Sequence, residues 1–272
     1  MTIQPFSWFQ IIRLGFVQMS IGSIVVLTTS TLNRIMVVEL MLPALLPGVL
    51  VALHYLIQVI RPRMGFGADQ SGKCTPWIIV GMAVLCFGGI LSTFATVLMY
   101  STPKLGIFLA FFGFLAIGLG VSASGTALLT LLAKRVDSKK RASAATIVWL
   151  MMIAGFAVTA GISGYFLDPF TPQKLLIIAA TISIICFLLT VFSLWKLETE
   201  KYYSDPSKSD ATNRTPEKNQ TQKDFFECIN EIWKENSSKK FTIFIFVSML
   251  AFSMQDLILE PFAGTVFEMT PG

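Results

Sequence analysis

The sequence predicts an all-α protein that crosses a membrane several times, and three observations support this prediction. Of the 272 residues, 54% are apolar and only 14% are charged, and the mean hydropathy is +0.68. Apolar runs of about 20 residues, which can cross roughly 30 Å of hydrocarbon, recur along the chain. Because lipid offers backbone groups no hydrogen-bond partners, unbroken runs of this length predict helices.

Six such runs are predicted to span the membrane, near residues 14–32, 44–60, 77–99, 106–133, 142–167 and 175–195. A seventh begins at Phe241 and reaches about Leu259. The buried helices of a soluble protein would show polar faces at helical spacing, and these runs lack them. The sequence therefore favours a polytopic membrane protein.

The distribution of basic residues predicts the orientation of the spans. With the N-terminus in the cytoplasm, 18 of the 21 Lys and Arg residues fall on that side, and only Arg34, Lys104 and Lys174 fall on the other. Basic residues in short loops are retained in the cytoplasm. The net charge of +5 is thus attributed to membrane orientation, and nucleic-acid binding is not expected. The first run is full-length and lacks a small-residue cleavage site, so we expect it to direct its own insertion.

A basic, glycine-rich segment, RPRMGFGADQSGK at residues 61–73, separates the second and third spans and is predicted to be a tight turn. Its Gly65, Asp69, Gly72 and Lys73 resemble the G-x-x-x-D-x-x-G-[RK] signature of the major facilitator superfamily. That resemblance implies a fold of two six-helix halves, with this hairpin helping to gate conformational change. The Asp69 carboxylate is expected to face a helix N-terminus, where negative charge is favourable, in the second half.

On this plan the chain divides into three parts. Residues 1–195 form the first six-helix half, residues 196–240 a cytoplasmic linker, and residues 241–272 the start of the second half with its first helix. Residues 200–221 carry too little apolar surface to fold. Since a second half needs five further spans, we expect the chain to be truncated after the seventh.

An amphipathic helix is predicted near residues 223–236 of the linker. One of its faces gathers the apolar residues Phe225, Phe226, Ile229, Ile232 and Trp233. Such a helix suits the membrane surface. Packing under the cytoplasmic hairpins would explain the same pattern.

Small residues predict that the fourth and fifth spans pack closely. They are Gly113, Ala116, Gly118, Gly120, Ser122 and Ser124, followed by Ala157, Ala160, Gly161 and Gly164. Small residues four apart let helix backbones approach. Packing within the bundle is favoured over a seam between copies of the chain.

Ionisable residues at the ends of spans predict a charge network between the two halves. Arg34 and Glu39 end the first span, and Asp256 and Glu260 end the seventh. Charges inside a membrane are costly and are usually paired. We expect Arg34 to pair with Asp256 or Glu260, whereas separate snorkelling of each side chain to the interface is the alternative.

Polar residues within the first two spans are candidates for ligand binding. His54, the only histidine, has Gln58 one turn later on the same face. The imidazole could ligate the magnesium of a chlorophyll-type pigment, with Gln58 bonding a ring carbonyl, or it could simply bond a neighbouring helix. Gln18, Gly22, Thr29 and Asn33 could share a cavity-facing stripe in the first span, and polar packing between helices would explain them equally well.

Catalytic motifs are absent from the sequence. It contains no nucleophile elbow, phosphate loop, zinc-ligand spacing or paired acid and base. The four cysteines fall within spans or on the cytoplasmic side, where thiols stay reduced. We expect free thiols, no metal site and no enzymatic activity.

Four strings resemble one specific group, the PucC/LhaA bacteriochlorophyll delivery family of the major facilitator superfamily. They are RLGFVQMSIGSIVVLTTSTLNRIMVVEL, LHYLIQVIRPRMGFGADQSGKCTPWII, AKRVDSKKRASAATIVWLMMIAGFAVTAG and MQDLILEPFAGTVFEM. The resemblance implies a twelve-helix protein in the inner membrane of a phototrophic bacterium. It also implies a role in assembling light-harvesting antennae, with bacteriochlorophyll as cargo and antenna polypeptides as partners.

Two functional hypotheses follow. One is an assembly factor that binds pigment and antenna helices. The other is a secondary transporter that moves a small solute by alternating access. Co-purifying pigment absorbance would favour the first, and ion-coupled uptake into vesicles would favour the second.

Overall fold

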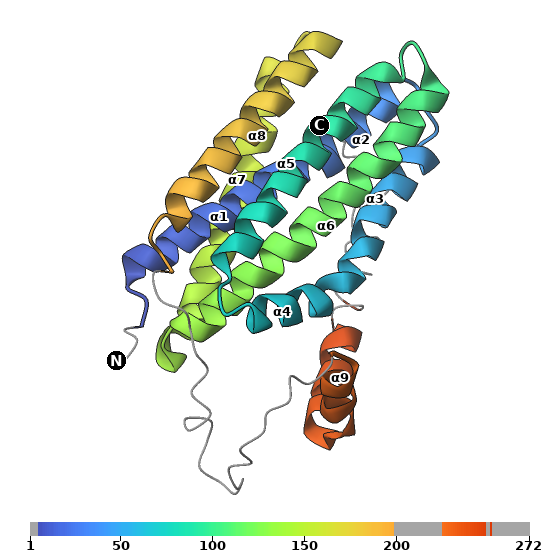
Figure 1. The fold of residues 1–272 in the computed structure, drawn as a ribbon. Coiled ribbons are helices and arrows are strands. Elements are labelled where there is room, and N and C mark those ends of the chain that lie inside the picture. The colour runs from blue at the N-terminus through green and yellow to red at the C-terminus, as the bar shows by residue number, and fades with distance from the viewer. Residues whose placement is uncertain (1–4, 199–224, 249–250, 252–272) are drawn as a thin grey trace, which may run out of the picture. The chain divides into compact units, whose positions relative to one another are not determined.

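The computed structural model describes residues 5–198, 225–248 and 251 of the chain. It contains two compact units, Met1–Pro206 and Ser207–Gly272. The first unit is a bundle of long helices, and no strand occurs in the described residues (Figure 1). The predicted all-α class is confirmed.

Six stretches of the bundle are long and apolar enough to cross a membrane, which confirms the six predicted spans. They are Trp8–Glu39, Leu45–Gln70, Thr75–Leu98, Pro103–Arg135, Ser138–Phe166 and Pro172–Leu194. The first comprises α1 (Trp8–Val26), a π-helical segment Leu27–Thr31, α2 (Leu32–Arg34) and a second π-helical segment Ile35–Glu39. The second comprises α3 (Leu45–Ile57), a 3-10 turn Gln58–Ile60 and α4 (Arg61–Gln70). The others are α5 (Thr75–Leu98), α6 (Pro103–Arg135), α7 (Arg141–Phe166, after a 3-10 turn Ser138–Lys140) and α8 (Pro172–Leu194).

Local sequence explains where several of these helices begin. Ser7 caps α1 through a reciprocal capping box with Gln10. Proline stands in the first turn of α5, α6 and α8, where its missing N–H costs no intrahelical bond. The Thr171 hydroxyl accepts from the Lys174 N–H at 3.3 Å and so caps α8.

The predicted turn at residues 61–73 is wrong over most of its length, because residues 61–70 form helix α4. Pro62 falls in the first turn of α4, where proline is tolerated, and it separates this helix from the axis of α3. Figure 1 shows α4 running at a steep angle to α3. The chain reverses only after Gln70, and Gly72 adopts a left-handed φ of +68° there.

Small residues bring helices together, but not the pair that the sequence predicted. A Cβ on Gly120 of α6 would lie 2.6 Å from the backbone nitrogen of Leu85 on α5. A Cβ on Gly155 of α7 would lie 2.6 Å from the carbonyl oxygen of Met19 on α1. The fourth span therefore packs closely on the third, and the fifth on the first. Gly161 has open space around it, because this part of α7 faces away from the bundle.

The second unit contains α9 (Phe225–Lys234) and a further helix over residues 236–248. Helix α9 falls within residues 223–236, where the sequence predicts an amphipathic helix, and the seventh apolar run begins as a helix. Most of that run, with Asp256 and Glu260, lies outside the described residues.

Candidate functional site

A line of polar side chains follows one face of the second span, and we call it the His54 ladder. The side-chain nitrogens His54 Nε2 and Gln58 Nε2 lie 2.9 Å apart. The Arg61 guanidinium donates to Gln58 Oε1. The predicted proximity of His54 and Gln58 is therefore confirmed, and Arg61 extends the line towards the end of the span.

The hydrogen bonds of the ladder define the role of each nitrogen. Because Gln58 Oε1 accepts from Arg61, the Gln58 amide presents its N–H to His54. His54 Nε2 is then the acceptor, and a neutral imidazole carries its proton on Nδ1. His54 Nδ1 and Arg61 Nε are both buried without a hydrogen-bond partner among the described residues.

The surroundings of His54 bear on pigment binding. His54 is 1% exposed. Its backbone carbonyl oxygen lies against α6, and a Cβ added to Gly118 would lie 2.8 Å from this oxygen. An axial magnesium ligand must offer a free lone pair, but the Nε2 lone pair faces the Gln58 amide. In this conformation pigment ligation would require Gln58 to move and the helices to part.

The polar residues of the first span have different surroundings, and their sharing of one stripe stays a prediction. Gln18 Nε2 lies 3.2 Å from Met152 Sδ of α7, and Gln18 Oε1 is buried without a partner among the described residues. Asn33, Arg34 and Glu39 are exposed near the far end of the span. Since Asp256 and Glu260 lie outside the described residues, the charge network between halves stays a prediction.

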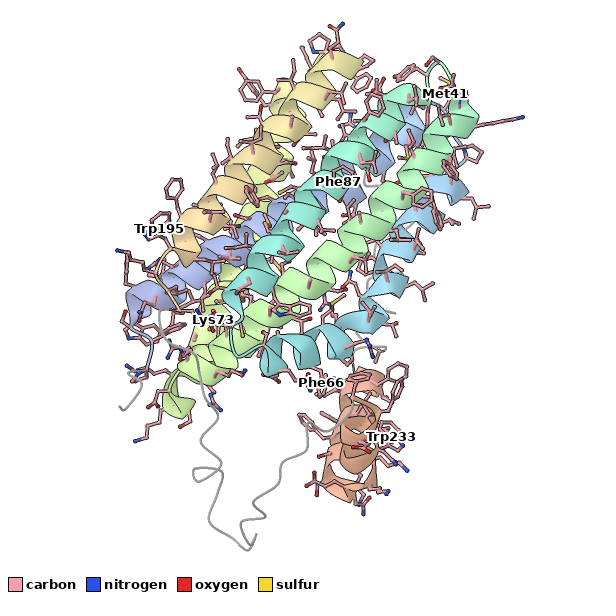
Figure 2. The ribbon with its side chains drawn as sticks, viewed as in Figure 1. Met41, Phe66, Lys73, Phe87, Trp195 and Trp233 are labelled. Carbon is pink, nitrogen blue, oxygen red and sulfur yellow. The ribbon has the colours of Figure 1, made fainter. Side chains whose placement is uncertain are left out.

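The residues of the hairpin motif lie against the end of α6. A Cβ on Gly65 would lie 3.1 Å from Thr126 Cγ2, so this glycine sits close to α6. Asp69 Oδ1 forms an ion pair of 2.5 Å with Lys134 Nζ, in the last turn of that helix. The Lys73 carbonyl accepts from the Ser71 hydroxyl at 2.9 Å, and Lys73 lies just before α5 (Figure 2). Asp69 thus has its partner within the first unit.

A carboxylate from the end of the sixth span caps α5. Glu198 Oε2 accepts from the backbone N–H groups of Cys74 at 2.9 Å and Thr75 at 2.8 Å. Cys74 supplies no side-chain cap of its own. A carboxylate at a helix N-terminus satisfies orphan donors and complements the helix dipole. No local pattern in the sequence predicts this contact, because 123 residues separate Glu198 from Thr75.

Burial and charge act together on the neighbouring thiol. Burial raises the pKa of Cys74 to about 11, and the negative charges of Glu198 and Asp69 add to this shift, whereas Lys134 opposes it. The thiol is free and buried. It is therefore protonated and unreactive near neutral pH.

Basic residues gather at the same end of the bundle, which we call the basic end. Arg13 Nε donates to the Ser193 carbonyl oxygen at 2.9 Å, and the same guanidinium donates to the carbonyl oxygen of Trp195, which follows α8 (Figure 2). The Arg135 guanidinium lies over the Phe6 ring, 5.5 Å from its centroid. These contacts fasten the ends of α1, α6 and α8 to one another.

An apolar groove opens beside the hairpin, and we call it the Trp77 groove. Its volume is about 410 Å³, and its lining comes from α4, α5 and α6: Met64, Pro76, Trp77, Val80, Gly81, Val84, Leu119 and Ala123. Val80 is 62% exposed, so the groove lies on the outside of the bundle. No local pattern in the sequence predicts this groove, because its walls come from three helices.

The indole of Trp77 is held in place at one wall of the groove. Trp77 Nε1 donates to Ser71 Oγ at 3.1 Å. A Cβ on Gly67 of α4 would lie 2.8 Å from Trp77 Cη2, so this glycine makes room for the ring. A Cβ on Gly81 would lie 2.5 Å from the Ser124 backbone nitrogen, which shows that α5 and α6 close the floor.

A family model described as "PUCC protein" matches residues 31–272. The chain belongs to the PUCC protein family. The matched region includes the His54 ladder, the hairpin motif, the Trp77 groove and Glu198. Gln18 lies before it. The resemblance to PucC-type proteins predicted from the sequence is confirmed.

Curated relatives match nearly the whole chain. It is 48% identical over 265 residues to "Bacteriochlorophyll synthase 44.5 kDa chain" of Rhodobacter capsulatus, which covers 97% of this chain and 59% of that relative. It is 30% identical over 276 residues to "Protein PucC" of Cereibacter sphaeroides, with 96% and 57% covered. "Uncharacterized protein in puhA-bchM intergenic region" of Rhodobacter capsulatus is 28% identical, with 97% and 55% covered.

The chain thus spans somewhat more than half the length of these relatives. No solved structure matches it.

Proposed function

We propose that this chain acts in a membrane assembly factor for photosynthetic light-harvesting complexes and binds bacteriochlorophyll as cargo. Its membership of the PUCC family supports this, as does the name of the relative that is 48% identical. Antenna polypeptides are the proposed protein partners. The proposed role is to hold and deliver pigment without catalysing covalent chemistry.

The observation that carries the proposal is the Trp77 groove. Ligand pockets are mostly apolar and have volumes of roughly 300–1,000 Å³, and the groove holds about 410 Å³. All of its lining side chains are uncharged. It opens on the outside of a spanning bundle, so a pigment dissolved in the bilayer could enter it sideways without crossing water.

The groove suits part of a bacteriochlorophyll molecule better than the His54 ladder does. The tetrapyrrole and its hydrocarbon tail are largely apolar, and burying apolar surface contributes roughly 25 cal/mol per Å². The fixed indole of Trp77 offers an aromatic wall for stacking. His54, by contrast, is buried and offers a pigment no open surface comparable to the Trp77 groove.

The proposed location is the inner membrane of a phototrophic bacterium, with the N-terminus in the cytoplasm. Six apolar helices fit a bilayer. The excess of Lys and Arg at the basic end supports a cytoplasmic position for that end.

The binding proposal can be tested by titrating the purified chain in nanodiscs with bacteriochlorophyll a. Binding is followed by the shift of the pigment absorption band and by quenching of tryptophan fluorescence. Ala123→Leu adds bulk to the groove wall, and overpacking costs roughly 1–3 kcal/mol, so binding should weaken by about 5- to 150-fold. Ala133→Leu, an exposed site on the same helix, is the matched control and should bind as the wild type does.

Two results would overturn the proposal. One is a wild-type chain that binds no pigment, and the other is equal affinity for the Ala123→Leu and Ala133→Leu variants. In a phototrophic host lacking the natural gene, the Ala133→Leu variant should restore antenna absorbance. The Ala123→Leu variant should not.

One observation favours a transporter as the second candidate. The first span is interrupted by π-helical segments at Leu27–Thr31 and Ile35–Glu39. Such segments are frequent at functional sites, and transporter sites often use interrupted helices. Ion-coupled solute uptake into proteoliposomes that does not respond to Ala123→Leu would support this candidate.

A further inference from the structure

A single residue separates helix α9 from the helix that follows it. Residues 225–234 and 236–248 are helical, and Glu235 alone separates them. The Glu235 carbonyl accepts from the Lys239 N–H at 3.0 Å, and its carboxylate accepts from the Ser238 hydroxyl at 2.8 Å. Lys239 Nζ reaches back to 6.0 Å from the centroid of the Trp233 ring. These contacts cap the second helix at Glu235 and connect it to the last turn of α9.

The helix after Glu235 becomes strongly apolar within two turns. From Phe241 to Val247 every residue but Thr242 is apolar, and Phe244 and Phe246 are 66% and 67% exposed. At 1.5 Å per residue, Phe241 lies about 9 Å beyond Glu235. The interfacial layer on each side of the hydrocarbon core is about 5–8 Å thick. If residues 241 onwards enter the hydrocarbon, Glu235 lies at the outer edge of the headgroup layer, and side chains of α9 can reach inward from there.

Helix α9 carries an apolar face that nothing in its own unit covers among the described residues. Phe226, Ile229 and Trp233 recur at spacings of three and four, so they share one face. They are 71%, 39% and 50% exposed. At 3.6 residues per turn, Glu227 and Lys234 lie roughly 110–130° around the helix from the centre of this face.

We infer that α9 lies in the plane of the membrane surface, with Phe226, Ile229 and Trp233 inserted at the boundary between headgroups and acyl chains. Chain continuity identifies the occupant of the apolar face as lipid, because one residue connects α9 to a membrane-entering helix. Aromatic rings favour this depth, and amphipathic helices bury their apolar face there. Lys234, Lys239 and Lys240 are placed at the level of lipid phosphates.

This surface anchor is independent of pigment binding. It would fix the direction from which the linker enters the membrane. Any second domain that follows residue 248 in a longer relative would then start from a defined height in the bilayer.

Site-directed spin labelling of the full chain in liposomes tests the inference. Single cysteines replace Phe226 and Ile229 on the apolar face, and Glu227 and Lys234 on the polar face, in a background where Cys74, Cys86, Cys186 and Cys228 are serine. Labels on the apolar face should collide with oxygen in preference to a water-soluble nickel complex. Labels on the polar face should show the reverse.

Two outcomes would overturn the inference. If the nickel complex reaches both faces equally, α9 lies in water. If apolar-face labels are inaccessible to both reagents, a protein surface covers them.

A second measurement needs no cysteine replacement. The difference in fluorescence between the wild type and Trp233→Phe isolates Trp233, and lipids brominated near the headgroup end of the acyl chain should quench it. An unquenched difference signal would contradict the inference.

Discussion

The carboxylate of Glu198 accepts a 2.8 Å hydrogen bond from the backbone N–H of Thr75, and this contact joins the end of the sixth span to the start of the third. The same oxygen accepts from the Cys74 N–H at 2.9 Å. Since no side chain next to α5 in sequence caps it, the helix relies on a residue that follows α8. The start of the linker is thereby held against the hairpin motif.

Removing the cap should destabilise the bundle. Loss of a helix N-cap costs roughly 0.5–2 kcal/mol, and we expect Glu198→Ala to lower the free energy of unfolding by this amount. Glu198→Gln keeps an acceptor but loses the charge that complements the helix dipole, so it should fall between Ala and the wild type. Reversible unfolding in mixed detergent micelles measures both. Equal stability of all three proteins would show that the cap contributes nothing.

The Cys74 thiol should react as an unusually weak acid. Burial, with help from Glu198, raises its pKa to about 11, so alkylation by a maleimide should stay slow until the pH approaches that value. Glu198→Gln removes a negative charge and should lower the apparent pKa. The rate is measured against pH in a Cys228→Ser background, and Cys74→Ser gives the signal to subtract. A rate profile centred on the ordinary pKa of the thiol would contradict this prediction.

The same shift makes a prediction about stability at high pH. The pKa of Cys74 is higher in the folded chain than in the unfolded chain, so the folded state retains its proton longer. The protonated Cys74 thiol contributes fully to stability below the pKa that it has in the unfolded chain, roughly 8.5. This contribution is lost as the pH rises towards 11, the pKa in the folded chain. Cys74→Ser should remove this part of the alkaline destabilisation, as measured by unfolding at a series of pH values.

Two glycines of α6 provide a matched test of helix packing. A Cβ on Gly120 would lie 2.6 Å from the backbone of Leu85, whereas a Cβ on Gly125 would meet nothing within 4 Å. Gly120→Ala should therefore force α5 and α6 apart and cost roughly 1–3 kcal/mol. Gly125→Ala should be neutral or slightly stabilising, because alanine favours helix over glycine. Similar melting temperatures for the two variants would refute the close approach.

The His54 ladder should behave as a unit. Gln58→Leu leaves the buried acceptor of His54 without a donor, which costs roughly 1–3 kcal/mol. Adding His54→Leu removes that unpaired group, so the double variant should be more stable than the Gln58→Leu single variant. Unfolding of the four proteins forms a double-mutant cycle. A double variant less stable than either single one would show that the two residues act separately.

Pigment titration of His54→Leu distinguishes the ladder from the groove. If bacteriochlorophyll occupies the Trp77 groove, this variant should bind it as the wild type does. A lost absorption shift in a folded His54→Leu protein would instead favour magnesium ligation by His54.

Much of this protein was determined by its sequence alone. The six spans were predicted because a bilayer demands about 20 apolar residues with internally satisfied backbones, a property of each segment by itself. The pairing of His54 with Gln58 and the amphipathic character of α9 were equally accessible, since both follow from helical spacing. The pairing of Arg34 with Asp256 or Glu260 stays a prediction.

Only the tertiary structure decided how distant segments meet. Asp69 pairs with Lys134, Glu198 caps α5, and Gly120 packs on the third span. Residues 61–70 of the predicted turn form helix α4. Its Gly65 lies against α6, and its Gly67 lies against Trp77. Each of these contacts joins residues whose separation along the chain follows no helical period. These contacts form only where particular helix faces pack together, and the local pattern of a single sequence does not specify which faces pack.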